Sequence, residues 1–174
     1  SVGMFFAELG AKVIKVENKL TNGDITRQWR VREEEKSEVT SAYYCSVNWH
    51  KKIRFLDLSK LNDRAEVYKL VEVADIIITN YKAGDALKLG MDYKTLKNIN
   101  SRIIYSHISG FGENIHRTAF DIVLQAETGY MYMNGNKKSG PLKMPVALID
   151  VLAAHQLKEA ILLAIIKRMK YGKG

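Results

Sequence analysis

The sequence predicts an α/β fold in which a parallel sheet is flanked by helices and the chain ends in a long helix. Short β-branched runs alternate with helical patterns, an order that is typical of βα units and a parallel sheet. The run Ile76-Ile77-Ile78 is continuously apolar, as expected for a strand that is buried on both faces inside such a sheet. The last helical pattern is the longest in the chain.

Apolar periodicity and cap residues place the individual elements. We expect strands at Lys12–Val16, Ile53–Leu56, Asp75–Thr79 and Arg102–His107. We expect helices at Asn62–Val73, Tyr93–Ile99, Phe120–Tyr132 and Ile149–Met169, and residues 4–10 have the pattern of a helix end followed by its glycine. A Gly- and Lys-rich turn from Asn134 to Pro145 precedes the last helix and is a candidate subdomain boundary.

Composition limits the class of protein. The chain has 174 residues, of which 47% are hydrophobic, so we expect a folded domain of ordinary size. The single cysteine excludes an internal disulfide framework and a multi-cysteine zinc site. No run of about 18 uncharged apolar residues and no signal peptide are visible, so we expect no membrane span and a cytoplasmic location. The net charge of +8 suits an anionic partner such as a nucleotide cofactor, RNA or an acidic protein, or else a solvated basic surface.

Candidate binding residues follow the predicted strands, because parallel sheets bind ligands beyond the carboxyl ends of their strands. The segments concerned are Glu17–Arg27, Asp57–Lys60, Thr79–Gly84 and Ser109–Glu113. The residues that could hold a phosphate-bearing ligand, or could be ordinary surface residues, are Arg27, Lys51, Lys52, Asn80, Tyr81 and Lys88. Gly110-Phe111-Gly112 does not complete a dinucleotide fingerprint, and the four histidines lack metal-ligand spacing, so we expect no metal site.

Two carboxylates, Asp121 and Asp150, lie within apolar runs near the predicted starts of helices. A carboxylate among apolar neighbours is costly unless something stabilises it, and a helix N-terminus does so. Two interpretations remain open for each aspartate. It is a helix cap, or it is a carboxylate held as a nucleophile or base.

Several motifs, in their order and spacing, make the whole chain similar to the family III CoA-transferases of the CaiB/BaiF type. This family includes formyl-CoA transferase, carnitine CoA-transferase and α-methylacyl-CoA racemase. The matching stretches are Leu9–Glu17 (LGAKVIKVE), Gly23–Arg27 (GDITR), Asn48–Lys52 (NWHKK), Leu56–Leu58 (LDL), Ala74–Tyr81 (ADIIITNY), Gly84, Leu89–Tyr93 (LGMDY), Ile108–Gly112 (ISGFG), Phe120–Ala126 (FDIVLQA) and Gly172–Gly174 (GKG).

The resemblance implies an architecture larger than this chain. Family members form interlocked homodimers with a Rossmann-like CoA-binding domain and a smaller second domain. Residues 1–174 would then be the CoA-binding domain of an N-terminal fragment, without the family's first strand and C-terminal half. Such a fragment is expected to show little or no turnover alone.

The resemblance also implies roles for particular residues. Asp150 matches the aspartate that carries CoA as a thioester during transfer, and Asp121 matches an acid near the reaction centre. Asn80 and Tyr81 would lie near the adenine of CoA, with Lys51, Lys52 and Lys88 near its phosphates. The racemases place a histidine where this chain has Phe120, and a phenyl ring cannot move a proton, so transferase is favoured over racemase.

Three classes of function therefore compete. The first is a CoA-transferase with acyl-CoA and carboxylic acid substrates, and the second is a CoA-binding or interaction module without chemistry. The third is a nucleic-acid-binding domain, but the basic residues are spread out and no nucleic-acid motif is recognised, so we expect no nucleic-acid partner.

Overall fold

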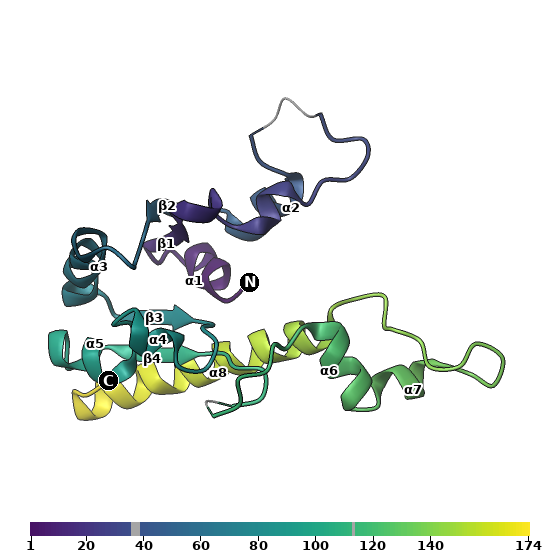
Figure 1. Cartoon of the computed structure of the whole chain (residues 1–174). Coiled ribbons are helices and arrows are strands. Elements are labelled where there is room, and N and C mark those ends of the chain that lie inside the picture. The colour runs from purple at the N-terminus through teal and green to yellow at the C-terminus, as the bar shows by residue number, and fades with distance from the viewer. Residues whose placement is uncertain (36–38, 113) are drawn as a thin grey trace. The chain divides into compact units, whose positions relative to one another are not determined.

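The computed structural model describes residues 1–35, 39–112 and 114–174, and it confirms an α/β fold with parallel strands among helices (Figure 1). The chain divides into two compact units, residues 1–70 and residues 71–174, and each holds one parallel strand pair. The strand pattern predicts one sheet, whereas the described strands form two separate pairs. The reason is that a pattern shows which residues favour strand, while pairing depends on contacts far apart in sequence.

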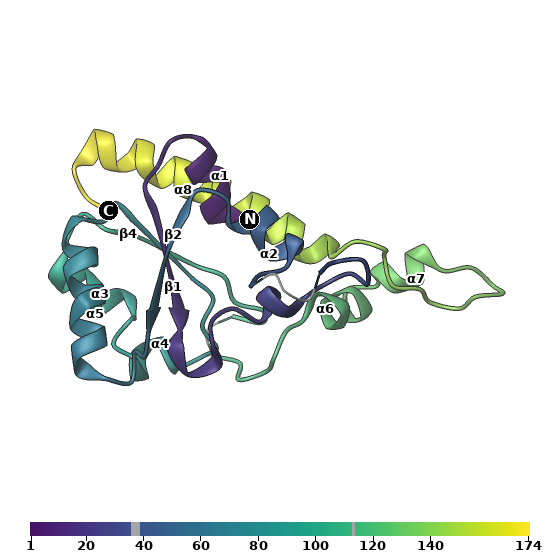
Figure 2. The ribbon, with the colours of Figure 1, turned by 90° about the horizontal axis from the view of Figure 1, so that it is seen from above.

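The first unit is built on the pair β1 (Val13–Asn18) and β2 (Lys51–Leu56), which run parallel with Val13 opposite Lys51 and Asn18 opposite Leu56. Helix α1 contacts both strands, and α2 contacts α1 and η2. The other elements of this unit are α1 (Val2–Glu8), η1 (Lys19–Thr21), η2 (Ile25–Gln28), α2 (Ala42–Asn48) and most of α3 (Leu61–Val73). Figure 2 shows β1 and β2 lying side by side.

A charged cluster around Glu17 fixes the segment that follows β1. The Glu17 carboxylate accepts hydrogen bonds from Arg27 Nε at 2.7 Å, from the backbone N–H of Asp24 at 3.1 Å and from the Tyr44 hydroxyl. Gly23 turns the chain there with a φ of 94°, and a Cβ at this position would collide with the Glu17 carboxylate. The cluster thereby ties η2 and α2 to the carboxyl end of β1.

The second unit is built on the parallel pair β3 (Ile76–Thr79) and β4 (Ile104–His107). Its core includes Met91, Leu96, Ile103 and Ile161, and the long helix α8 packs against β4 and α6. Ile78 is exposed, so β3 is less buried than its apolar run predicts. The reason is that, among the described strands, β3 has one neighbour only, which is β4. The remaining elements are α4 (Asp85–Lys88), α5 (Tyr93–Ile99), α6 (Asp121–Glu127), α7 (Tyr130–Asn134) and α8 (Leu148–Tyr171).

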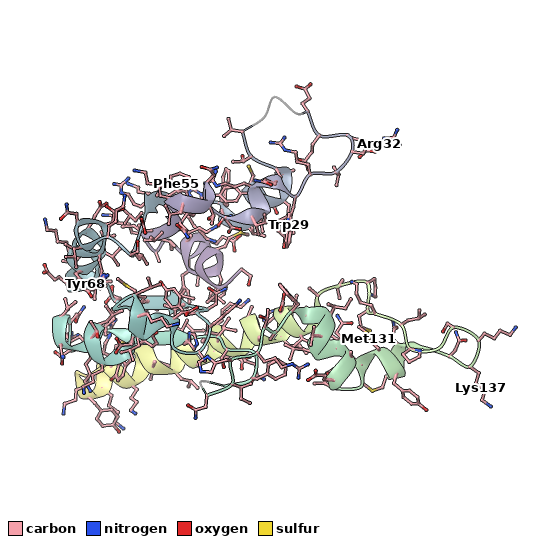
Figure 3. All side chains as sticks on the ribbon, in the orientation of Figure 1. Trp29, Arg32, Phe55, Tyr68, Met131 and Lys137 are labelled. Atoms are coloured by element: carbon pink, nitrogen blue, oxygen red, sulfur yellow. The ribbon has the colours of Figure 1, made fainter. Side chains whose placement is uncertain are left out.

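The prediction of one helix at Phe120–Tyr132 is wrong, because the segment forms two helices, α6 and α7. Gly129 lies between them with a φ of 83°, a left-handed conformation that ends the first helix. The Gly- and Lys-rich turn is confirmed as an exposed loop that closes through a hydrogen bond from Gly140 N–H to the Asn136 carbonyl at 2.9 Å. It does not separate the two units, because the chain divides between residues 70 and 71. Lys137 lies at the tip of this loop (Figure 3).

Among the described residues, no helix combines the length and the apolar character that crossing a bilayer requires. The longest helix, α8, carries charged residues along its length, as its sequence indicates.

Candidate active site

Asp121 and Asp150, which are far apart in the sequence, come together where α8 begins. Asp121 is the first residue of α6 and Asp150 lies in the first turn of α8. One carboxylate oxygen of Asp121, Oδ1, accepts the backbone N–H of Ile149 at 2.8 Å and that of Asp150 at 3.3 Å. The two acidic residues that the sequence singles out therefore share one site.

Asp121 acts as the cap of α8 and not only as an acid at the start of its own helix. The residue before α8, Ala147, has no side chain that can accept a hydrogen bond. The Val146 carbonyl accepts the N–H of Leu148 at 2.9 Å, and Asp121 accepts the next two N–H groups. Because these donors would otherwise lack partners, a negative charge is stabilised at this helix end.

Asp150 is exposed, and among the described residues no hydrogen bond holds its carboxylate. Partial burial of the carboxyl, followed by the negative charge of Asp121, raises the pKa of Asp150 above its ordinary value. A carboxylate that is accessible and more basic than usual is better suited to attack an electrophilic carbon.

Gln125 is a third member of this site, although the sequence does not single it out as a candidate. Its side chain is fully buried and donates a hydrogen bond to the second carboxylate oxygen of Asp121. The signal in the sequence is the spacing of four residues between Asp121 and Gln125, which places both on one face of α6.

The predicted ligand residues of the second unit follow β3 and lie on α4. Asn80 is exposed and Tyr81 is half-buried, directly after the strand ends at Thr79. Burial, and then the nearby Tyr105, raise the pKa of Tyr81. Lys88 is exposed at the end of α4, and its Nζ lies 3.3 Å from Asp85 Oδ1. Glu113, in the predicted segment after β4, lies outside the described residues.

The predicted ligand residues of the first unit are not gathered at one end of the strands. Lys51 and Lys52 open β2 at its amino end, whereas Arg27 lies beyond the carboxyl end of β1. Lys51 Nζ donates to the Val47 carbonyl at 2.7 Å and to Asn48 Oδ1 at 2.9 Å. Burial, and then the charge of Lys15, lower the pKa of Lys51 to about 8. Arg27 is held by Glu17, so two of these three cations already have protein partners.

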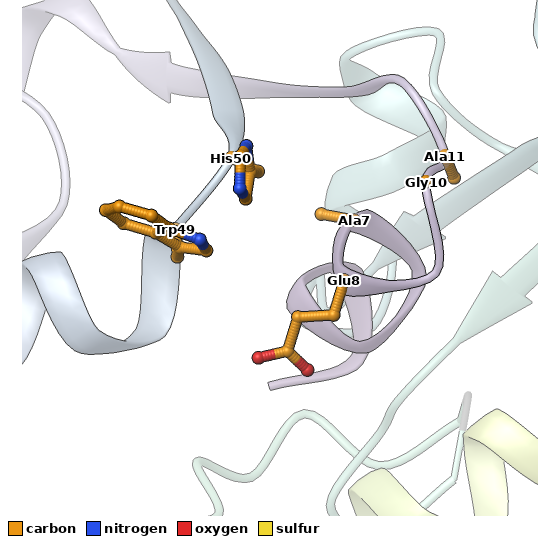
Figure 4. A pocket seen from close by; sticks show the side chains of 6 residues that line it. All are labelled: Ala7, Glu8, Gly10, Ala11, Trp49 and His50. Atoms are coloured by element: carbon orange, nitrogen blue, oxygen red, sulfur yellow. The ribbon is translucent and has the colours of Figure 1, made fainter.

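A cavity of about 450 Å³ lies in the first unit, near the amino ends of β1 and β2. The residues that line it are Ala7, Glu8, Gly10, Ala11, Trp49 and His50 (Figure 4). None of them is a predicted site residue. In the part of the chain that the structure describes, no group of three or more His, Cys, Asp or Glu side chains could hold a metal ion.

Comparison with known proteins gives a consistent set of relatives. Residues 1–174 match the model of the family described as CoA-transferase family III. The chain is 34% identical to succinate–glutarate CoA-transferase of Agrobacterium fabrum over 99% of its length, and 32% identical to human succinyl-CoA:glutarate CoA-transferase over 98%. A crystal structure of a CaiB/BaiF family protein from Brucella suis matches 99% of the chain with 36% identity and a TM-score of 0.88.

These relatives are longer than the chain. The match spans 44% of the Agrobacterium protein, 39% of the human protein and 46% of the Brucella chain. Residues 1–174 thus correspond to less than half of each relative.

Proposed function

Because the chain belongs to CoA-transferase family III, we propose that it is part of an enzyme that moves CoA from an acyl-CoA donor to a carboxylic acid acceptor. The observation that carries this proposal is that the carboxylate of Asp150 is accessible and has a raised pKa. The backbone N–H of the same residue donates to Asp121, which fixes its position. A transferase of this kind needs one nucleophile that can accept first an acyl group and then CoA.

The proposed reaction passes twice through an anhydride on Asp150. The Asp150 carboxylate attacks the thioester carbonyl, the C–S bond breaks, and CoA leaves as a thiolate. The thiolate then attacks the aspartyl carbonyl, the anhydride C–O bond breaks, and the donor acid leaves as a carboxylate. The acceptor carboxylate repeats both steps in reverse order, so Asp150 returns to its free form and no net proton is consumed.

Other residues of the chain would bind and orient the reactants. Asp121 supports the reaction by holding the start of α8. We assign Asn80 and Tyr81 to the adenine of CoA, and basic side chains to its diphosphate and 3′-phosphate. The net charge of +8 supports this assignment, because cations attract the phosphates. In the second unit this basic residue is Lys88. Of the candidates in the first unit, Lys52 is exposed, whereas Arg27 and Lys51 already have protein partners.

Within this proposal, residues 1–174 are the Rossmann-like CoA-binding domain of a longer cytoplasmic protein. The support for the greater length is the share of the relatives that the chain matches, which is below half in each case. We expect little turnover from the 174-residue chain alone, since the relatives contain as much sequence again outside the matched region.

Trapping the aspartyl intermediate tests the function. The intact protein that contains this chain is incubated with succinyl-CoA and glutarate, which the names of the relatives suggest as substrates, and hydroxylamine is then added. We expect peptide mapping by mass spectrometry to find the hydroxamate on Asp150, because hydroxylamine cleaves both the anhydride and the thioester. Normal turnover with Asp150 unlabelled would refute the proposed mechanism.

We further propose that the intact protein is a homodimer, supported by an exposed apolar face on α8. This face comprises Val151, Leu152, Leu162, Leu163, Ile166 and Met169, with Leu163 66% exposed and Ile166 62% exposed. Large exposed apolar patches mark interaction sites. The occupant that we assign is a second copy of the protein.

The substitution Leu163→Glu in the intact protein tests this assignment. Burying a carboxylate at the interface is expected to raise the dimer dissociation constant by about 30-fold or more, measured by light scattering over a dilution series. The control Leu87→Glu makes the same change at an exposed leucine of α4, outside this face. Equal dissociation constants for Leu163→Glu and the unmodified protein would rule out this face as the dimer interface.

A further inference from the structure

Gln125 is a buried polar side chain whose amide is hydrogen-bonded at both ends. It is 0% exposed, and both ends of its amide are used. Its Nε2 donates to Asp121 Oδ2 and to the Val146 carbonyl at 3.1 Å, while its Oε1 accepts the Met144 N–H at 2.8 Å. A carboxylate and a carbonyl can only accept, and a backbone N–H can only donate, so the amide fits in one orientation.

These contacts join three segments at the site. Gln125 lies on α6, Met144 and Val146 belong to the loop after α7, and Asp121 contacts the first turn of α8. The loop contacts hold the chain immediately before α8, and the Asp121 contact holds the cap of the same helix. A single side chain therefore constrains the start of α8 from two directions.

The two oxygens of Asp121 have separate partners. Oδ1 accepts the N–H groups of Ile149 and Asp150, and Oδ2 accepts the amide of Gln125. A carboxylate with both oxygens held cannot rotate freely. The charge of Asp121 in turn raises the pKa of Asp150. Gln125 is thus linked to Asp150 through the position and the charge of one intervening carboxylate.

We infer that Gln125 is a positioning residue that keeps Asp121 oriented, and thereby holds Asp150 in place for attack on the acyl-CoA. This inference rests on the proposed function, since it takes Asp150 as the nucleophile. Gln125 touches neither substrate nor reacting atoms, so its effect is on the geometry and basicity of Asp150. No shorter side chain reaches Asp121, Met144 and Val146 together, and glutamate lacks the two donors.

Two substitutions in the intact protein test the inference. Gln125→Leu keeps the approximate volume and removes all three hydrogen bonds. Gln125→Glu places a second carboxylate against Asp121, and the two can share one proton when the pH falls. We expect kcat for CoA transfer to drop by roughly 10- to 100-fold in both variants near neutral pH, because small displacements of a reacting group have effects of this size. KM for the acyl-CoA should change by less than about twofold, since the proposed CoA-binding residues are untouched.

The pH dependence of kcat distinguishes a positioning role of Gln125 from a role in core packing alone. Lowering the pH protonates the carboxylate pair in Gln125→Glu and returns a donor to Asp121. The loss of kcat in this variant, relative to the unmodified protein at the same pH, should therefore become smaller as the pH falls. The Gln125→Leu variant has no such donor, so its relative loss of kcat should not become smaller. Asn98→Leu is the control, because Asn98 carries an exposed amide on α5 in the same unit, and its kcat should equal that of the unmodified protein.

Each outcome decides the matter. A kcat for Gln125→Leu within about twofold of the unmodified enzyme, or a Gln125→Glu deficit that is the same at every pH, would overturn the inference. Failure of both variants to fold, judged by circular dichroism, would also overturn it, because Gln125 would then be a core residue only. Full activity of Asp150→Asn would instead show that the proposed function fails, whatever the Gln125 variants do.

Discussion

Replacing Asp150 with asparagine is expected to lower the rate of CoA transfer by about 10³-fold or more, because an amide cannot act as the nucleophile. The substitution keeps the size of the side chain, and the backbone N–H of residue 150 can still donate to Asp121. The measurement is kcat for transfer from succinyl-CoA in the intact protein, together with hydroxylamine trapping. We expect both the rate and the hydroxamate to be lost.

Glu72→Gln is the matched control for this variant. Glu72 is exposed on α3 in the second unit, so the substitution removes one negative charge away from the candidate site and from the apolar face of α8. Its kcat and its melting temperature should equal those of the unmodified protein. Transfer by Asp150→Asn at a rate similar to that of Glu72→Gln would show that another group carries the acyl intermediate.

Local patterns in the sequence predict most of the elements that hold this site. The expected helix Tyr93–Ile99 matches α5 at both ends, since Asp92 caps it and accepts the Thr95 N–H at 3.1 Å. The short helix α2 is not predicted, because its aromatic and β-branched residues are weak helix formers. Its cap is nevertheless visible as Ser41, whose hydroxyl accepts the Tyr44 N–H at 3.0 Å.

The candidate site is predicted only in part, because its contacts are not local. The apolar surroundings of Asp121 and Asp150 single out both residues, but they do not reveal that Asp121 caps α8 across a separation of 28 residues. The sequence leaves Arg27 as either a phosphate ligand or a surface cation, although burial beside Glu17 gives it a protein partner. Interactions of this kind depend on how the segments pack, which a periodicity in the sequence does not contain.

Glu17→Gln is expected to destabilise the first unit by about 3 kcal/mol, because it leaves the partly buried Arg27 without its counter-charge. The Glu17 side chain is almost completely buried, and Arg27 and Tyr44 both donate to it. The measurement is urea unfolding of the 174-residue chain followed by tryptophan fluorescence. Both tryptophans, Trp29 and Trp49, belong to this unit, so the signal reports on it directly.

Glu66→Gln is the control, since Glu66 and Arg54 form an exposed ion pair at 3.8 Å in the same unit. Exposed pairs contribute little, so the free energy of unfolding should change by about 0.5 kcal/mol or less. Equal effects of Glu17→Gln and Glu66→Gln would contradict a stabilising role for the buried cluster.

The pH dependence of stability gives an independent check on the charge of Glu17. Burial raises the pKa of Glu17, but hydrogen bonds from Arg27, Tyr44 and the Asp24 N–H, with the charge of Lys15, outweigh burial and lower it to about 2. A pKa that is lower in the folded state stabilises that state fully above the ordinary value of 4.5, and the contribution is lost as the pH falls from there toward 2. The free energy of unfolding should therefore decrease over this range in the unmodified chain. In Glu17→Gln the decrease should be smaller, because glutamine does not titrate, and an identical decrease in both proteins would show that Glu17 is not the group responsible.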